Sequence, residues 1–161
     1  RDEKDMLYSD NDERMIFFTK GVIETVKKLN WSPDIIHLHG WFTSLFPLYL
    51  KTYYKDEPIF ADCKIVTSVY AKDFEGVFSK DFHKKVAFDE IPDEEITLLK
   101  KANFENLTQL SLNYSDGYVI ADAETPKEIG KNSVAEKIPS LNYEETLQKD
   151  AFINFYSQNI I

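Results

Sequence analysis

Two histidines on one face of a predicted strand are the residues of this sequence best suited to chemistry. His37 and His39 lie two positions apart in the apolar, β-rich run 34–39, which predicts a strand buried on both faces. Imidazole nitrogens can bind a metal ion, hydrogen-bond a ligand or stabilise developing charge. Gly40 and Trp41 follow directly, and a glycine at that point suits a sharp turn.

The two histidines alone make an incomplete metal site, because no third Cys, Asp or Glu stands at a fixed ligand spacing. We therefore expect no metal and no cofactor, and we interpret His37 as a structural histidine hydrogen-bonded to nearby backbone. His39 is the candidate catalytic residue, since ligands of open parallel sheets bind beyond the carboxyl ends of the strands. Cys63 is the single cysteine and is predicted to be a buried thiol without a catalytic role.

The elements that must position these residues have the order of a parallel α/β fold. The strand at 34–39 is followed by an interrupted helix over 41–54 and by a second apolar strand over 64–70. A strand–helix–strand unit implies parallel pairing. A third strand is predicted over 118–121, so we expect a Rossmann-like parallel sheet flanked by helices, in one domain covering 1–161.

Helix-start signals complete the predicted frame. Asp10, with Glu13 three residues later, predicts the cap of a first helix, and Asp10 is also a candidate polar group at the binding cleft. Further helices are predicted over 93–112, 125–130 and 142–157. Their predicted caps are Asp93, Thr125 and Asn142.

The segment 71–92 breaks this regular pattern. Its mixed polar and aromatic residues form a connection that is long for a compact α/β unit, which is typical of functional or mobile loops. We expect it to lie near the site, with His83 at the surface.

Composition excludes several classes of function. The net charge of −9 arises from 28 acidic and 19 basic residues, and no basic stripe could neutralise a nucleic-acid backbone. No apolar run reaches the roughly 18 residues of a membrane span. With one cysteine, which cannot form an internal disulfide, the sequence predicts a cytoplasmic protein without nucleic-acid or membrane partners.

The ordered motifs resemble the N-terminal domain of bacterial glycogen and starch synthases. In that family an Asp-Asn…Arg-Phe helix precedes a Pro-Asp-Val-Val-His-x-His-Asp-Trp segment and, later, a Tyr-Ala-Asp strand start. The resemblance covers roughly residues 10–121 and is strongest over 31–45. The matching residues are Asp10, Asn11, Arg14, Pro33, Asp34, His37, His39, Trp41 and the trio Tyr114-Ser115-Asp116.

This resemblance implies one half of a two-domain GT-B glycosyltransferase. The implied reaction is retaining transfer of glucose from ADP-glucose or UDP-glucose, as substrate, to an α-1,4-glucan acceptor. His39 is implied to hydrogen-bond the transferred sugar near the reaction centre, and Asp10, Gly40 and Trp41 to contribute to substrate binding. A C-terminal GT-B domain, in the parent protein or a separate chain, is the implied partner.

Departures from the family pattern favour an alternative. Gly40 stands where the family usually has Asp, and Val69-Tyr70 stand where it has His-Asn. The family's Lys-Thr-Gly-Gly-Leu loop is absent from these 161 residues, and five scattered glycines cannot cradle a diphosphate. We therefore expect this chain alone to be inactive, and a degenerate, non-catalytic domain that binds glucan or a partner protein remains the alternative.

Overall fold

A four-stranded parallel sheet forms the centre of the computed structural model, which describes residues 7–88, 90–125 and 134–161. The strand order is β1 (Ile35–His39), β2 (Lys64–Val69), β3 (Gly117–Ile120) and β4 (Ser140–Leu141), and every neighbouring pair is parallel. The predicted parallel α/β architecture and its first three strands are confirmed. The two-residue β4 was not predicted.

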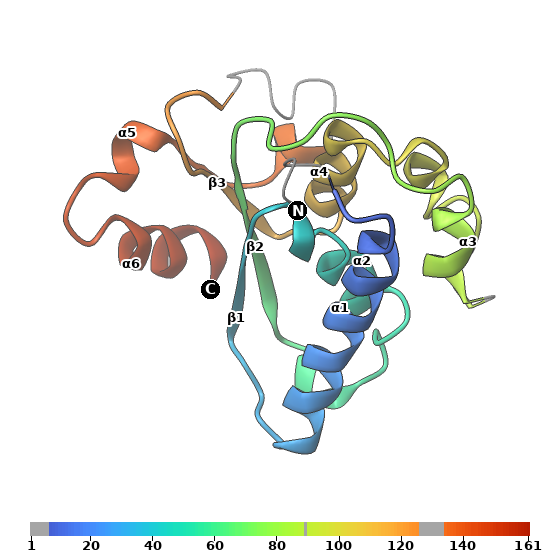
Figure 1. The fold of residues 1–161 in the computed structure, drawn as a ribbon. Helices are drawn as coiled ribbons and strands as arrows, with labels where there is room; N and C mark the ends of the chain where they lie inside the picture. Colours follow the sequence, from blue (N-terminus) through green and yellow to red (C-terminus); the bar gives the residue numbers. More distant parts are fainter. Residues whose placement is uncertain (1–6, 89, 126–133) are drawn as a thin grey trace.

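Helices cover both faces of the sheet (Figure 1). The long helix α1 lies with α2 and α4 on one face, and the C-terminal α6 lies on the other. The helical elements are α1 (Asn11–Lys28), η1 (Trp41–Thr43), α2 (Phe46–Lys51), η2 (Pro58–Phe60), α3 (Phe82–Ala87), η3 (Thr97–Lys101), α4 (Phe104–Asn113), η4 (Val134–Lys137), α5 (Tyr143–Thr146), α6 (Ala151–Phe155) and the π-helical η5 (Tyr156–Ile160).

Alternation along β2 divides the core between the two faces. Ile65 belongs to the large apolar cluster packed by α1, α2 and α4, whereas Val66 belongs to a smaller cluster with Phe155 and Ile160 from the tail. Both β2 side chains are fully buried, as expected of a strand covered by helices on each side. Cys63, just before β2, is also buried, and burial raises the pKa of its thiol to about 11.

The helix predicted over 93–112 is divided in the structure, and the predicted cap at Asp93 is wrong. Asn103 caps α4 instead, because its side-chain oxygen accepts a hydrogen bond from the Asn106 backbone N–H at 2.9 Å. The backbone carbonyl of Asp93 accepts a hydrogen bond from the Thr97 hydroxyl at 3.0 Å.

The helix predicted over 142–157 is likewise divided, into α5, α6 and η5. Its predicted start is confirmed, since the Asn142 backbone N–H donates to Glu145 Oε2 at 2.9 Å. Asp150 then adopts a left-handed conformation with φ of 60°, which interrupts a continuous helix. The helix predicted over 125–130 lies almost wholly outside the described residues.

Asp10 does not cap α1 as predicted. It is the residue before the helix, but among the described residues no backbone N–H of the first turn donates a hydrogen bond to its side chain. Its carboxylate instead forms an ion pair with Arg14 Nε at 2.9 Å, and Glu13 pairs with Lys85 rather than returning a capping bond.

Asp12 anchors the irregular segment 71–92 to α1. Its carboxylate is buried and accepts hydrogen bonds from the Ser79 hydroxyl and, at 2.9 Å, from Lys85 Nζ in α3. Burial acts to raise the pKa of Asp12, but the hydrogen bonds from Ser79 and Lys85 outweigh it, so the pKa lies below its usual value. Asp12 therefore carries its charge at neutral pH and holds the segment in place.

We expect Asp12→Ala to destabilise the fold, because the change removes a buried carboxylate that accepts hydrogen bonds from two half-buried donors, Ser79 and Lys85. The expected loss in free energy of unfolding is about 2 kcal/mol, measured by urea denaturation. Asp10→Ala is the control, since its ion pair with Arg14 is solvent-exposed and should contribute well under 1 kcal/mol. Equal losses in the two variants would contradict the anchoring role.

Candidate functional site

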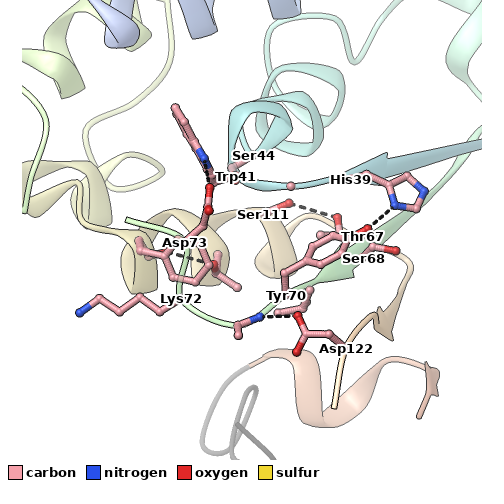
Figure 2. Close-up of a pocket in the computed structure, with 15 residues that line it drawn as sticks. His39, Trp41, Ser44, Thr67, Ser68, Tyr70, Lys72, Asp73, Ser111 and Asp122 are labelled. Atoms are coloured by element: carbon pink, nitrogen blue, oxygen red, sulfur yellow. Dashed lines mark hydrogen bonds between the residues drawn. The ribbon is translucent and has the colours of Figure 1, made fainter. Parts of the chain in front are cut away.

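A cavity of about 530 Å³ opens at the carboxyl ends of β1 and β2, beside α4 (Figure 2). This is the edge where ligands of open parallel sheets bind. Its walls come from the end of β1, the end of β2 with the loop that follows, one side of α4, and Asp122 after β3. The lining residues are His39, Gly40, Trp41, Ser44, Thr67, Ser68, Val69, Tyr70, Ala71, Lys72, Asp73, Phe104, Thr108, Ser111 and Asp122.

His39 lies at this edge as predicted. Its ring is exposed and packs on the His37 ring, with centroids 4.3 Å apart. His39 Nδ1 lies 2.8 Å from the hydroxyl oxygen of Tyr70, which follows β2 (Figure 2). Tyr70 stands out in the sequence only as a departure from a family pattern, whereas in the structure it is the partner of His39.

His37 is hydrogen-bonded to side chains, so the predicted backbone partners were wrong. Its Nε2 lies 2.8 Å from Ser68 Oγ, and its Nδ1 lies 2.6 Å from the hydroxyl of Tyr156 in the tail. Burial, with a smaller contribution from neighbouring His39, lowers the pKa of His37 to about 4. His37 is therefore uncharged at neutral pH.

Gly40 forms the turn between β1 and η1 in a conformation that favours glycine. Its φ of 74° and ψ of 163° are almost closed to residues with a Cβ, although an added Cβ would meet no atom within 4 Å. The turn thus requires glycine for its backbone rather than for lack of space. The Thr43 hydroxyl further fixes it by donating to the Gly40 carbonyl at 2.9 Å.

Trp41 both packs and lines the cavity. Its indole Nε1 donates to Asp73 Oδ2 at 2.6 Å, which ties η1 to the loop after β2. The ring packs edge-on against Phe74 and Phe42, with centroids 5.2 and 5.3 Å away. This aromatic cluster holds the cavity wall in shape.

Hydroxyl and carboxylate groups that the sequence analysis did not single out complete the site. Thr67 Oγ1 lies within hydrogen-bond distance of the hydroxyls of Ser111 and Ser115, at 3.1 and 2.8 Å. Asp122 accepts from the Ala71 backbone N–H at 2.8 Å and so joins the ends of β2 and β3. The position of Asp122 at the carboxyl end of a strand could have marked it as a site residue from the sequence. No sequence signal marks the hydroxyls of Thr67, Ser111 and Ser115.

The remaining predictions have separate outcomes. Asp10 is not among the residues that line this cavity, and its role in substrate binding stays a prediction. In the described parts of the chain, no three His, Cys, Asp or Glu side chains gather closely enough to hold a metal ion. His83, predicted at the surface, is half-buried, and its Nδ1 is buried without a hydrogen-bond partner among the described residues.

Comparison with known proteins decides the family. The protein-family model described as the starch synthase catalytic domain matches residues 2–144 of this chain. The chain belongs to this family. The match confirms the resemblance inferred from the motifs around His39, and it ends before α6 and η5, so Tyr156 lies outside the matched region.

Related proteins of this family include several bacterial glycogen synthases. Glycogen synthase of Vibrio parahaemolyticus is 34% identical over 143 residues, which cover 83% of this chain and 28% of the relative. The Clostridium perfringens enzyme is 30% identical over 156 residues, covering 92% and 31%, and that of Chlorobium luteolum is 42% identical over 81 residues, covering 50% and 17%. The chain thus spans less than a third of the length of these relatives. Across the described residues, no helix is long and apolar enough to cross a membrane.

Gly40→Ala tests the backbone requirement at the turn. Because the added Cβ has room, the cost should be conformational strain alone, about 1–2 kcal/mol in the free energy of unfolding. Gly21→Ala is the matched control: it also meets open space, but it lies inside α1, where alanine is favoured by up to about 1 kcal/mol. Chemical denaturation should show opposite signs, and destabilisation by both changes would refute the assignment.

His37 should make stability depend on pH. Since its pKa is about 4 in the folded chain and near 6.5 when unfolded, the unfolded state binds more protons between these values, and stability falls as pH decreases through that window. After allowance for partial exposure, we expect a loss on the order of 1 kcal/mol between pH 7 and pH 5. Urea unfolding of His37→Gln should lack this component; an identical pH slope in both proteins would exclude it.

Proposed function

We propose that the complete protein containing this chain is a glycogen or starch synthase that transfers glucose from ADP-glucose or UDP-glucose to an α-1,4-glucan. The observation that carries the proposal is the position of His39 in a cavity at the carboxyl edge of the sheet, in a chain of the starch synthase catalytic domain family. The relatives named glycogen synthase support it.

In the proposed reaction, the bond between sugar C1 and the diphosphate oxygen breaks, and the 4-hydroxyl oxygen of the glucan end bonds to the same carbon with retention. The hydroxyl proton leaves with the released nucleoside diphosphate. Positive charge develops on the sugar ring during transfer, and a preorganised polar group stabilises such charge at little reorganisation cost. The imidazole of His39, or a neighbouring backbone carbonyl, is the proposed group.

The chain supplies only part of the proposed machinery. Trp41 offers an aromatic wall, and the hydroxyls of Thr67 and Tyr70 offer hydrogen-bond partners for sugar hydroxyls. A glycine-rich loop for the diphosphate is absent from the sequence, so we assign the phosphate contacts to a Lys-Thr-Gly-Gly-Leu loop and a C-terminal GT-B domain outside this chain. We further propose that the enzyme is cytoplasmic, which the single cysteine supports, and that it uses no cofactor.

A non-catalytic, glucan-binding domain is the second candidate. Gly40 and Val69-Tyr70 favour it, because they replace polar residues that the family usually carries. The hydroxyl of Tyr70 favours the synthase instead, since it places a polar group within hydrogen-bond distance of His39.

Replacing His39 tests the proposal. In the complete protein, His39→Ala should lower the incorporation of labelled glucose into glycogen by about 100-fold or more, the size of effect seen when a preorganised charge-stabilising group is lost. His83→Ala is the matched control, because His83 lies outside the cavity lining, and it should keep nearly full activity.

The wild-type protein itself separates the two candidate functions. Incorporation of glucose from ADP-glucose or UDP-glucose supports the synthase. Co-sedimentation with glycogen without incorporation from either donor would instead establish the non-catalytic binding domain.

A further inference from the structure

Two stacked imidazoles, each paired with a tyrosine, occupy the face of the sheet covered by the tail. The rings of His37 and His39 lie 4.3 Å apart at an interplanar angle of 36°. In each ring it is Nδ1 that meets a phenol: Tyr156 at 2.6 Å from His37 and Tyr70 at 2.8 Å from His39. A neutral imidazole has one donor and one acceptor nitrogen, so these partners bear on which nitrogen holds the hydrogen.

His37 serves as an uncharged platform for His39. Burial holds its pKa far below neutrality, and burial raises the pKa of Tyr156, so both groups are neutral. Because His37 is held at both nitrogens, by Tyr156 and Ser68, it packs against the His39 ring as a fixed, uncharged surface.

The direction of the Tyr70 hydrogen bond follows from the chemistry of its two groups. A phenol O–H is the more acidic donor of the pair, with an ordinary pKa near 10, and an unprotonated imidazole nitrogen is a stronger acceptor than a phenol oxygen. The Tyr70 O–H therefore donates to His39 Nδ1. When the His39 ring is uncharged, its one ring hydrogen then resides on Nε2.

The pairing of β1 with β2 places the Tyr70 hydroxyl within hydrogen-bond distance of His39. In the parallel pairing of β1 with β2, His39 lies opposite Ser68. Tyr70 follows Ser68 by two residues and so falls on the same face as His39. Both residues line the cavity, and the bond joins two strand ends 31 residues apart in sequence.

We infer that Tyr70 is a positioning residue for His39: its hydroxyl fixes the tautomer and orientation in which His39 offers Nε2–H to an acceptor oxygen of the bound sugar. This inference rests on the proposed function for the reaction that the positioned ring serves. It assigns a role to Tyr70, which stands where the family usually has Asn and whose hydroxyl gives His39 a polar partner in this chain.

The experiment combines nitrogen NMR with kinetics of the complete protein. With ¹⁵N-labelled histidine, long-range ¹H–¹⁵N spectra distinguish the two ring nitrogens, and the signals of His37, His39 and His83 are assigned by replacing each with Gln. We expect His39 of the wild type to carry its hydrogen on Nε2. Tyr70→Phe should shift His39 toward a mixture of tautomers and leave His37 unchanged, whereas Tyr156→Phe should alter the His37 signals.

The kinetic part tests whether the pairing serves transfer. Tyr70→Phe keeps the ring and removes one hydrogen bond, so kcat should fall about 10-fold while KM for the sugar nucleotide changes less than twofold. Tyr53→Phe is the matched control, because it removes a phenol hydroxyl outside the cavity lining, and it should leave both constants unchanged.

Three results would overturn the inference. They are a wild-type His39 with its hydrogen on Nδ1, a His39 tautomer unaffected by Tyr70→Phe, and an unchanged kcat in that variant. Failure of the proposed function is recognised separately: the wild type would then transfer no glucose, although its spectra would still show the Nε2–H tautomer. That outcome would remove the positioning role together with the reaction and leave only the Tyr70–His39 hydrogen bond.

Discussion

The parallel register of β1 and β2 is the constraint on which the site depends. Because His39 pairs with Ser68, the two strands end at the same edge, and the residues that follow them form neighbouring walls of one cavity. Side-chain alternation then gives each face its own task. Leu38 enters the main apolar core, while His37 and His39 project to the opposite face, where the tail covers part of the sheet.

Polar contacts between segments far apart in the sequence fix the irregular segment 71–92 and the C-terminal tail onto this frame. Asp12 holds Ser79 and Lys85, which lie 67 and 73 residues further along the chain, and Tyr156 meets His37 across 119 residues. Each of these groups is at least partly withdrawn from water, where a lost partner costs more than at the surface. The irregular segment and the tail are therefore fixed to the sheet at particular points rather than by apolar packing alone.

Sequence patterns predicted the first three strands and the site edge but not β4 or these contacts. The apolar runs around Val66 and Leu38 identify buried strands, because composition and period report burial directly. The helix divisions at Asn103 and Asp150 were not predicted, because the apolar pattern continues past both residues. An amide cap at Asn103 and a left-handed conformation at Asp150 nevertheless interrupt the helices there. No sequence pattern distinguishes Asp12 from its acidic neighbours, because only the folded chain brings Ser79 and Lys85 to its carboxylate.

The indole of Trp41 gives the cavity an optical property of its own. The chain has two tryptophans, and the other, Trp31, is 61% exposed in the connection before β1. Trp41 is half-buried, hydrogen-bonded to Asp73 and part of the cavity lining. Its fluorescence emission therefore depends on the polarity of the cavity, whereas that of Trp31 depends on bulk water. External quenchers reach Trp31 first, which leaves Trp41 as an intrinsic reporter of ligand occupancy.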